Sequence, residues 1–187
     1  METPTGRFLT LPDVKADQIC IEDIAESLGK QCRYVGHCIP FYSVGEHSIL
    51  MSDMFGLQNF RLALLALMHD AHEYITGDIQ PFVKKLFPGI RDLENHFQML
   101  IYGALDIEPP TETEARLVKS VDIAIKFTEI RQISKSGGAA WPNFDESKVL
   151  DIKINGLDPG RVKRDFLERW DTLIKAKETY FESNEVV

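Results

Sequence analysis

The chain has 187 residues, of which 44% are apolar and 27% charged, which is long enough for one domain with a real core and ordinary for a soluble globular protein. Its formal net charge of −8 disfavours binding to a nucleic-acid backbone, so we expect no stable nucleic-acid partner. No apolar run approaches the roughly 20 residues that span a bilayer, and no signal-peptide pattern opens the sequence, so we expect a cytoplasmic protein without a membrane partner.

Helical periodicity dominates the chain from residue 21 onward. In chain order, we expect helices over about residues 21–28, 43–55, 59–74, 89–105, 111–133 and 159–180. Ser43 with Glu46, and Thr111 with Glu114, have the spacing of capping boxes, and Pro159 suits a first helical turn. Residues 149–154 alternate apolar and polar side chains as a short strand does. The pattern therefore predicts an all-α fold, with residues 1–187 forming a single compact helical bundle.

A histidine and an aspartate stand at the end of a nearly continuous apolar run, residues 62–68. That run predicts a buried helix, and buried polar side chains need partners. A divalent metal ion satisfies His69 and Asp70 at once. Glu73 follows them by four and three positions, on the same side of a helix. Gly77 permits a sharp turn that returns Asp78 toward the same region.

Two further candidate ligands lie on other predicted helices. His47 is early in the second helix, and Asp122 interrupts an otherwise apolar face of the long helix 111–133. Two imidazoles and two carboxylates suit a first-row ion such as Zn, Co, Mn or Fe, with positions left for water. An open position is what a catalytic metal needs to activate water.

The motifs around these residues resemble the HD phosphohydrolase superfamily. Segments 43–48 (Ser-Val-Gly-Glu-His-Ser), 69–73 (His-Asp-Ala-His-Glu) and 76–81 (Thr-Gly-Asp-Ile-Gln-Pro) look like its bacterial 5′-deoxynucleotidase branch. Segments 21–25, 32–37 and 41–44 look like the small phage hydrolases that include dATP triphosphohydrolases. The resemblance covers roughly residues 6–135. His47 and His69 are closer together in sequence than the matching histidines of the longer bacterial enzymes. The substrate specificity that loops confer on those enzymes therefore does not carry over to this chain, whereas the set of ligands does.

The resemblance implies a role for each matching residue. His47, His69, Asp70 and Asp122 would hold a divalent ion (Zn, Co or Mn), with Mg at a possible second site. Glu73 would orient or deprotonate the attacking water, and Asp78 would contact the substrate sugar or hold the second ion. Arg33 would contact phosphate. If a phage encodes the chain, the location would be the host cytoplasm, and we expect a homo-oligomer.

Plainer interpretations stand beside several of these assignments. Asp78 also suits a turn, Arg33 an ordinary surface position, and His37 either a substrate contact or a structural role. Lys126 and Glu129 follow Asp122 by one and two helical turns. They could line the same cleft as Asp122, or they could be an exposed pair on the helix surface. We take Arg33, His37 and Lys126 as the candidate substrate contacts.

The function expected from this pattern is hydrolysis of a deoxynucleotide phosphate. A dNTP triphosphohydrolase of the dATP type comes first, and a 5′-deoxynucleotidase acting on dNMPs is the close alternative, because both need the same metal site. An alarmone or cyclic-nucleotide hydrolase and a non-catalytic nucleotide-binding module are the further alternatives. The small-molecule deoxynucleotide is the expected partner.

Overall fold

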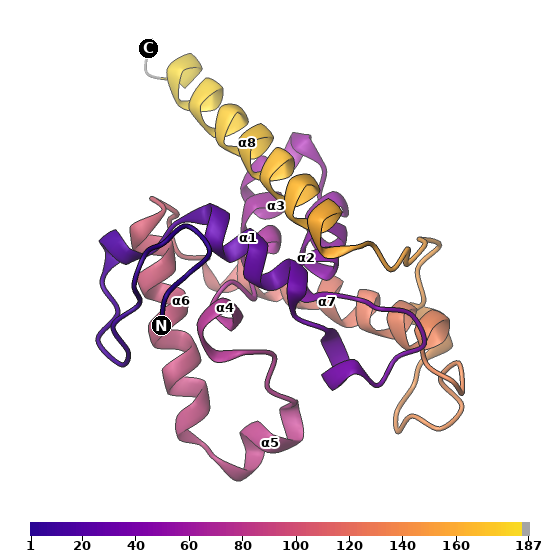
Figure 1. Cartoon of the computed structure of the whole chain (residues 1–187). Coiled ribbons are helices and arrows are strands. Elements are labelled where there is room, and N and C mark those ends of the chain that lie inside the picture. Colours follow the sequence, from indigo (N-terminus) through magenta and orange to yellow (C-terminus); the bar gives the residue numbers. More distant parts are fainter. Residues whose placement is uncertain (185–187) are drawn as a thin grey trace.

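The computed structural model describes residues 1–184, and within that range every regular element is a helix (Figure 1). The all-α prediction is therefore confirmed. The helices are α1 (Ile21–Lys30), α2 (Val44–Asp53), α3 (Phe60–Leu67), α4 (Glu73–Thr76), α5 (Pro81–Leu86), α6 (Gly89–Ala104), α7 (Glu112–Ile133) and α8 (Pro159–Asn184). Short 3₁₀ turns lie at Ala16–Gln18, Arg33–Gly36, Leu57–Asn59 and Glu146–Lys148.

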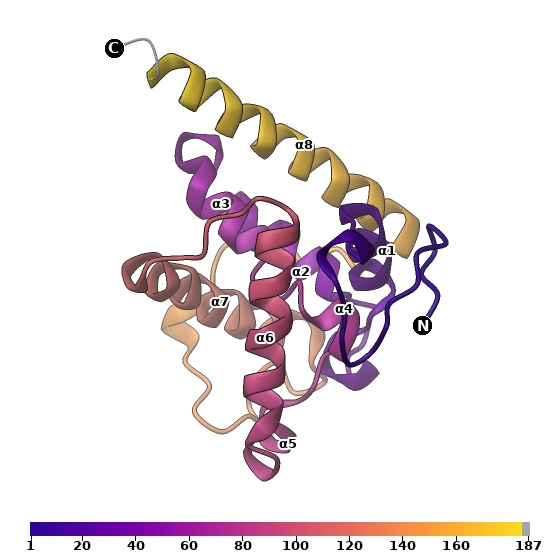
Figure 2. The same ribbon diagram turned by 90° about the vertical axis from the view of Figure 1, so that its left-hand side faces the viewer.

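The core forms where α8 lies across α1, α2 and α3 (Figures 1 and 2). Helix α3 is the central element because its residues from Leu62 onward are all buried. Helix α8 contributes Phe166 and Leu173, both fully buried, and its C-terminal part extends beyond the rest of the bundle (Figure 1). Within residues 1–184, no helix is both long enough and apolar enough to cross a membrane.

Helices α1, α2 and α8 meet without room for side chains at one point. A Cβ atom on Gly45 would lie 2.7 Å from a methyl group of Val162 on α8 and 3.1 Å from the backbone nitrogen of Gly29 on α1. Real Cβ atoms do not come so close, so a glycine is required for this packing. The contact fixes the first turn of α2, which carries His47 two residues later.

The N-terminus of α2 uses only half of the predicted capping box. The Ser43 hydroxyl accepts a hydrogen bond from the backbone N–H of Glu46, as expected. The Glu46 carboxylate does not return to Ser43. It accepts instead from the backbone N–H groups of residues 155, 156 and 157, at 3.0, 3.1 and 2.8 Å. Glu46 thus ties the segment before α8 to α2, whereas the capping box of Thr111 and Glu114 is complete.

The single helix predicted over residues 59–74 is wrong, because the helix ends at Leu67 and resumes only at Glu73. A side chain of α6 replaces the missing helical bonds. The Gln98 amide donates to the carbonyl of Met68 at 2.8 Å, and its oxygen accepts from the backbone N–H of His72 at 3.1 Å. The break releases His69 and Asp70 from helical spacing, so both can face one point.

The strand predicted over residues 149–154 is also absent. Its backbone groups pair with side chains of α7 rather than with another strand. Thr128 accepts from the N–H of Leu150, and the Gln132 amide both donates to the carbonyl of Ile152 and accepts from the N–H of Ile154. The alternation therefore reflects an extended segment packed along a helix. Helix α5, which the sequence did not predict, follows Asp78.

Candidate metal centre

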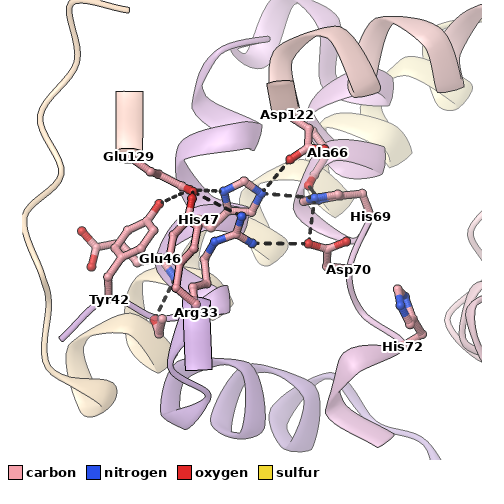
Figure 3. Close-up of polar contacts among 12 residues, drawn as sticks. Arg33, Tyr42, Glu46, His47, Ala66, His69, Asp70, His72, Asp122 and Glu129 are labelled. Atoms are coloured by element: carbon pink, nitrogen blue, oxygen red, sulfur yellow. Dashed lines mark hydrogen bonds and ion pairs between the residues drawn. The ribbon is translucent and has the colours of Figure 1, made fainter. Parts of the chain in front are cut away.

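The four predicted ligands come from three separate parts of the fold and meet (Figure 3). His47 projects from α2, His69 and Asp70 from the turn after α3, and Asp122 from α7. The Nε2 atoms of the two histidines lie 3.3 Å apart, and Nε2 of His69 lies 3.1 Å from Oδ2 of Asp70. Asp122 joins through Oδ1, 3.5 Å from Nε2 of His47. Ligand atoms of His47, His69 and Asp70 all lie within 4.8 Å of one another.

The other ring nitrogen of each histidine is held by an oxygen acceptor. Nδ1 of His69 lies 2.7 Å from the carbonyl oxygen of Ala66, and Nδ1 of His47 lies 2.6 Å from Oε1 of Glu129. Both Nδ1 atoms must therefore donate, which leaves the two Nε2 lone pairs facing each other in neutral imidazoles. In the neutral form these lone pairs repel each other at 3.3 Å, and either a proton or a metal ion between them removes the repulsion. In the metal-free protein a proton does so: burial and Arg33 lower the pKa of His47, but Glu129 and Asp122 outweigh them, so that pKa is raised. The donor set therefore fits a divalent metal ion.

The two ligand carboxylates are held in their ionised form. Burial alone would raise the pKa of Asp70, but the charges of His69, His47 and Arg33 outweigh burial and hold that pKa well below its ordinary value. Burial likewise opposes ionisation of Asp122, and the hydrogen bond with His47 outweighs it, so the pKa of Asp122 is also lowered. Ionised carboxylates are the form that binds a metal ion.

Glu129 is the buried centre of the polar network behind His47, and the sequence interpretation did not identify this role. Its side chain is fully buried and binds Nδ1 of His47, the hydroxyl groups of Tyr34 and Tyr42, and Nη2 of Arg33 at 3.2 Å. Burial opposes its charge, but Arg33 and His47 lower the pKa of Glu129 to about 2. The exposed-pair alternative for Glu129 is therefore wrong. The position of Glu129 two helical turns after Asp122, on the same face of α7, was the sequence feature that indicated a place near the ligands.

Arg33 points inward, so its interpretation as an ordinary surface residue is wrong. Its Nη1 lies 3.7 Å from Oδ2 of Asp70 and its Nη2 binds Glu129, and only 12% of the side chain is exposed. Its Nε is buried and has no hydrogen-bond partner within residues 1–184. The guanidinium thus links a candidate metal ligand to the carboxylate behind His47.

The turn that carries Arg33 has a strained backbone. Tyr34 and Val35 adopt φ values of 56° and 54°, in the left-handed region. A β-branched residue such as Val35 rarely takes this conformation, which costs roughly 1–3 kcal/mol. The strain is held in place by the bond from the Tyr34 hydroxyl to Glu129. Strained segments of this kind concentrate at functional sites.

Glu73 and Asp78 form an acidic group beside the ligands. Glu73 is buried at the start of α4, and its Oε2 has no hydrogen-bond partner in the described part of the chain. Burial, with the nearby charges of Asp70 and Asp78, raises the pKa of Glu73 to about 10. Burial also raises the pKa of Asp78, and Arg33 opposes it. Gly77, with φ of 77°, turns the chain between the two.

The remaining predicted substrate contacts lie outside the cluster. Lys126 has an exposed side chain and follows Asp122 by one turn on the same face of α7. His37 is exposed too, and it lines a small cavity with Tyr34 and Trp141 rather than the metal site. Neither residue makes a hydrogen bond or ion pair with a candidate ligand in residues 1–184. Their assignment to substrate stays a prediction.

The ligands open into a cavity of about 420 Å³ between α6 and α7. His69, Asp70 and Asp122 line one part of it. The rest of the wall is provided by α3, α6 and the start of α7. A larger groove of about 860 Å³ lies beneath the end of α8, and among the described residues its lining includes none of the four ligands. Three of the four candidate metal ligands therefore face the smaller cavity.

Two relatives match nearly the whole chain. The uncharacterized protein YfdR of Escherichia coli (strain K12) is 32% identical over 174 residues, which span 92% of this chain and 94% of the relative. The uncharacterized protein RCAP_rcc00048 of Rhodobacter capsulatus is 30% identical over 184 residues, again 92% of this chain and 94% of the relative. The chain matches no protein-family model.

Proposed function

This chain belongs to the same family as YfdR and RCAP_rcc00048, and we propose that it is a metal-dependent phosphohydrolase of the HD type that acts on deoxynucleotides. The observation that carries the proposal is the pair of histidine Nε2 atoms, 3.3 Å apart, beside two ionised carboxylates. When bound there, a divalent ion would act as a Lewis acid toward phosphate and would activate water for attack.

The chain's own residues supply the other parts of such a reaction. Glu73 is buried next to Asp70 and Asp78 and carries a carboxyl oxygen without a partner in the described residues. A bound divalent ion would offset the negative charges that raise the pKa of Glu73, so the ionised carboxylate could then accept the proton of the attacking water. Arg33 lies beside Asp70 with its Nη atoms paired to Asp70 and Glu129 and its Nε without a partner in residues 1–184, so its positive charge would complement the negative charge of a phosphate. Asp78 affects the pKa of Glu73 through its charge and is itself affected by Arg33, and it would hold a sugar hydroxyl or a second ion.

Two leaving groups are compatible with this site. The segments that resemble phage triphosphohydrolases favour release of inorganic triphosphate from a dNTP such as dATP. The segments that resemble bacterial 5′-deoxynucleotidases favour release of phosphate from a dNMP. An alarmone or cyclic-nucleotide hydrolase would use the same ligands, whereas a non-catalytic module would not need Glu73. The complete set of ligands and Glu73 supports an enzyme.

A direct test is to purify the protein without chelator and incubate it with each dNTP and dNMP, adding Zn²⁺, Co²⁺, Mn²⁺ or Mg²⁺ in turn. We expect metal-dependent hydrolysis, with triphosphate as the product from dATP. Phosphate release from dNMPs alone would identify the nucleotidase instead. No turnover of any nucleotide by metal-loaded protein would contradict the proposal.

A matched pair of variants separates the metal site from a contaminating phosphatase. Asp122→Asn removes a candidate ligand, and Asp151→Asn makes the same change at an exposed position away from the cluster. We expect the first variant to lose the activity and the second to retain it. Equal activity in both would assign the hydrolysis to another protein in the preparation.

A further inference from the structure

The cavity beside the ligands has a charged part and a neutral part. The charged or ligand-bearing residues of its lining are His69, Asp70, Lys119 and Asp122. The Lys119 ammonium donates to Oδ2 of Asp122 at 2.6 Å, and its side chain is 69% exposed. The phosphate end of a substrate would therefore meet the ligands and Lys119, which leaves the neutral part for an uncharged group.

The neutral part extends along one face of α7. Ala115, Val118 and Asp122 are spaced at i, i+3 and i+7, so they lie in a row on the same side of the helix. At 1.5 Å per residue, the row extends roughly 10 Å from the metal ligand to Ala115. Leu65 of α3 and Pro110 complete the apolar lining. Apolar walls with few polar groups are typical of small-molecule sites.

Helix α6 contributes the polar groups of this wall. Asn95 and Tyr102 line the cavity from α6. Asn95 is exposed, and its carboxamide has no hydrogen-bond partner within residues 1–184, while Tyr102 is almost fully buried. A carboxamide offers one acceptor and two donors side by side, which matches the N6 and N7 edge of adenine.

We propose that this cavity is the nucleoside site of the enzyme, with the base between α6 and α7 and the Asn95 carboxamide bonded to its edge. The inference rests on the proposed function. The larger groove is the weaker candidate because its lining, among the described residues, holds none of the four candidate metal ligands, whereas His69, Asp70 and Asp122 line this cavity. The ligand class is a deoxynucleotide, and adenine is the base that best suits Asn95.

Ala115→Phe tests the site by filling it. Ala115 is exposed on α7, so a larger side chain there would project into the cavity without disturbing the core. The matched control is Ser120→Phe, which adds the same ring at an exposed position of α7 that does not line the cavity. Calorimetric titration of metal-loaded protein would give the affinities for a non-hydrolysable dATP analogue and for inorganic triphosphate.

We expect Ala115→Phe to weaken binding of the dATP analogue by tenfold or more and to change the affinity for triphosphate by less than twofold. Ser120→Phe should bind both ligands like wild type. Asn95→Ala should weaken binding of the dATP analogue by roughly tenfold and should reduce the preference for it over a thymidine triphosphate analogue. Equal affinity of Ala115→Phe and wild type for the analogue would overturn the inference, as would a wild-type protein that binds triphosphate but not the analogue.

The same measurements separate this inference from the proposed function. Hydrolysis of dATP that is unaffected by Ala115→Phe would place the base elsewhere and leave the proposed function intact. Analogue binding that Ala115→Phe abolishes, in a protein without hydrolytic activity, would support the nucleoside site and contradict the enzyme.

Discussion

The Nδ1 atom of His47 lies 2.6 Å from Oε1 of Glu129, and both side chains are fully buried. The carboxylate fixes which nitrogen of His47 carries the proton and so directs Nε2 toward His69 and Asp122 (Figure 3). Glu129 is itself fixed by Arg33 and Tyr42. The orientation of one candidate ligand therefore depends on a residue that does not touch the metal position.

Glu129→Gln should weaken metal binding by roughly 10–100-fold, the usual effect of removing a carboxylate partner from a ligand histidine. Competition with a chromogenic chelator would measure the affinity for Zn²⁺ or Co²⁺. Tyr42→Phe is the control, because it removes one hydrogen bond to Glu129 but leaves the bond to His47. Wild-type metal affinity in a folded Glu129→Gln variant would show that Glu129 serves only the fold.

His69→Ala should abolish tight metal binding, whereas His72→Ala should keep it. His72 is only three positions away, but its Nδ1 lies 3.1 Å from the Gln98 oxygen and it is not among the clustered ligands. Elemental analysis of protein purified without chelator is expected to give about one transition ion per chain in wild type and in His72→Ala. A His69→Ala protein with the full metal content would remove His69 from the ligand set.

Replacement of Arg33 should affect stability as well as activity, because its guanidinium is bound to Asp70 and Glu129. Arg33→Ala leaves a buried carboxylate without its cation, and we expect the free energy of unfolding to fall by about 3 kcal/mol. Arg33→Lys keeps the positive charge but loses the planar set of guanidinium N–H donors, so kcat/KM for dATP should fall. Arg33→Ala removes the charge as well, so kcat/KM should fall further. Arg91→Ala, at an exposed position of α6, is the control.

If both Arg33 variants match wild type in urea unfolding and in kcat/KM, phosphate recognition lies elsewhere. If only stability changes, Arg33 supports the network around Glu129 and has no part in binding substrate. The two measurements thus separate the structural role of Arg33 from its proposed catalytic role.

Glu73→Gln should retain the metal and lower turnover by roughly 10²–10⁴-fold, the span expected when a general acid or base is lost. The carboxamide keeps the size of the side chain but cannot exchange a proton. Steady-state rates with dATP, measured together with metal content, would check this. Rates near wild type in a metal-loaded variant would exclude Glu73 from proton transfer.

Local signals explain which parts of this structure could be predicted. The start of α7 could be predicted because Thr111 and Glu114 form a local capping box, and the resemblance of the motifs to a known family predicted that the candidate ligands lie together. The end of α3 could not be predicted, because Gln98, thirty residues further along the chain, replaces its helical bonds. The burial of Glu129 depends in the same way on Tyr34, Tyr42 and Arg33, which no local pattern connects to α7.

The stability of the metal-free protein should depend on pH through Glu73. Its pKa rises from an ordinary 4.5 to about 10 on folding, with burial as the largest cause. Between these values the unfolded chain binds fewer protons than the folded one, so the free energy of unfolding falls as pH rises, by at most roughly 1.4 kcal/mol per pH unit. The lowered pKa values of Asp70 and Asp122 have the opposite effect, because they make the free energy of unfolding rise with pH at acid pH.

Comparison of wild type with Glu73→Gln isolates the effect of Glu73, because both proteins contain Asp70 and Asp122. Glu73→Gln lacks the titrating group, so its stability relative to wild type should increase from pH 6 to pH 9. Urea unfolding with a chelator present, at several pH values, would measure the difference, and a difference independent of pH would contradict a buried, protonated Glu73.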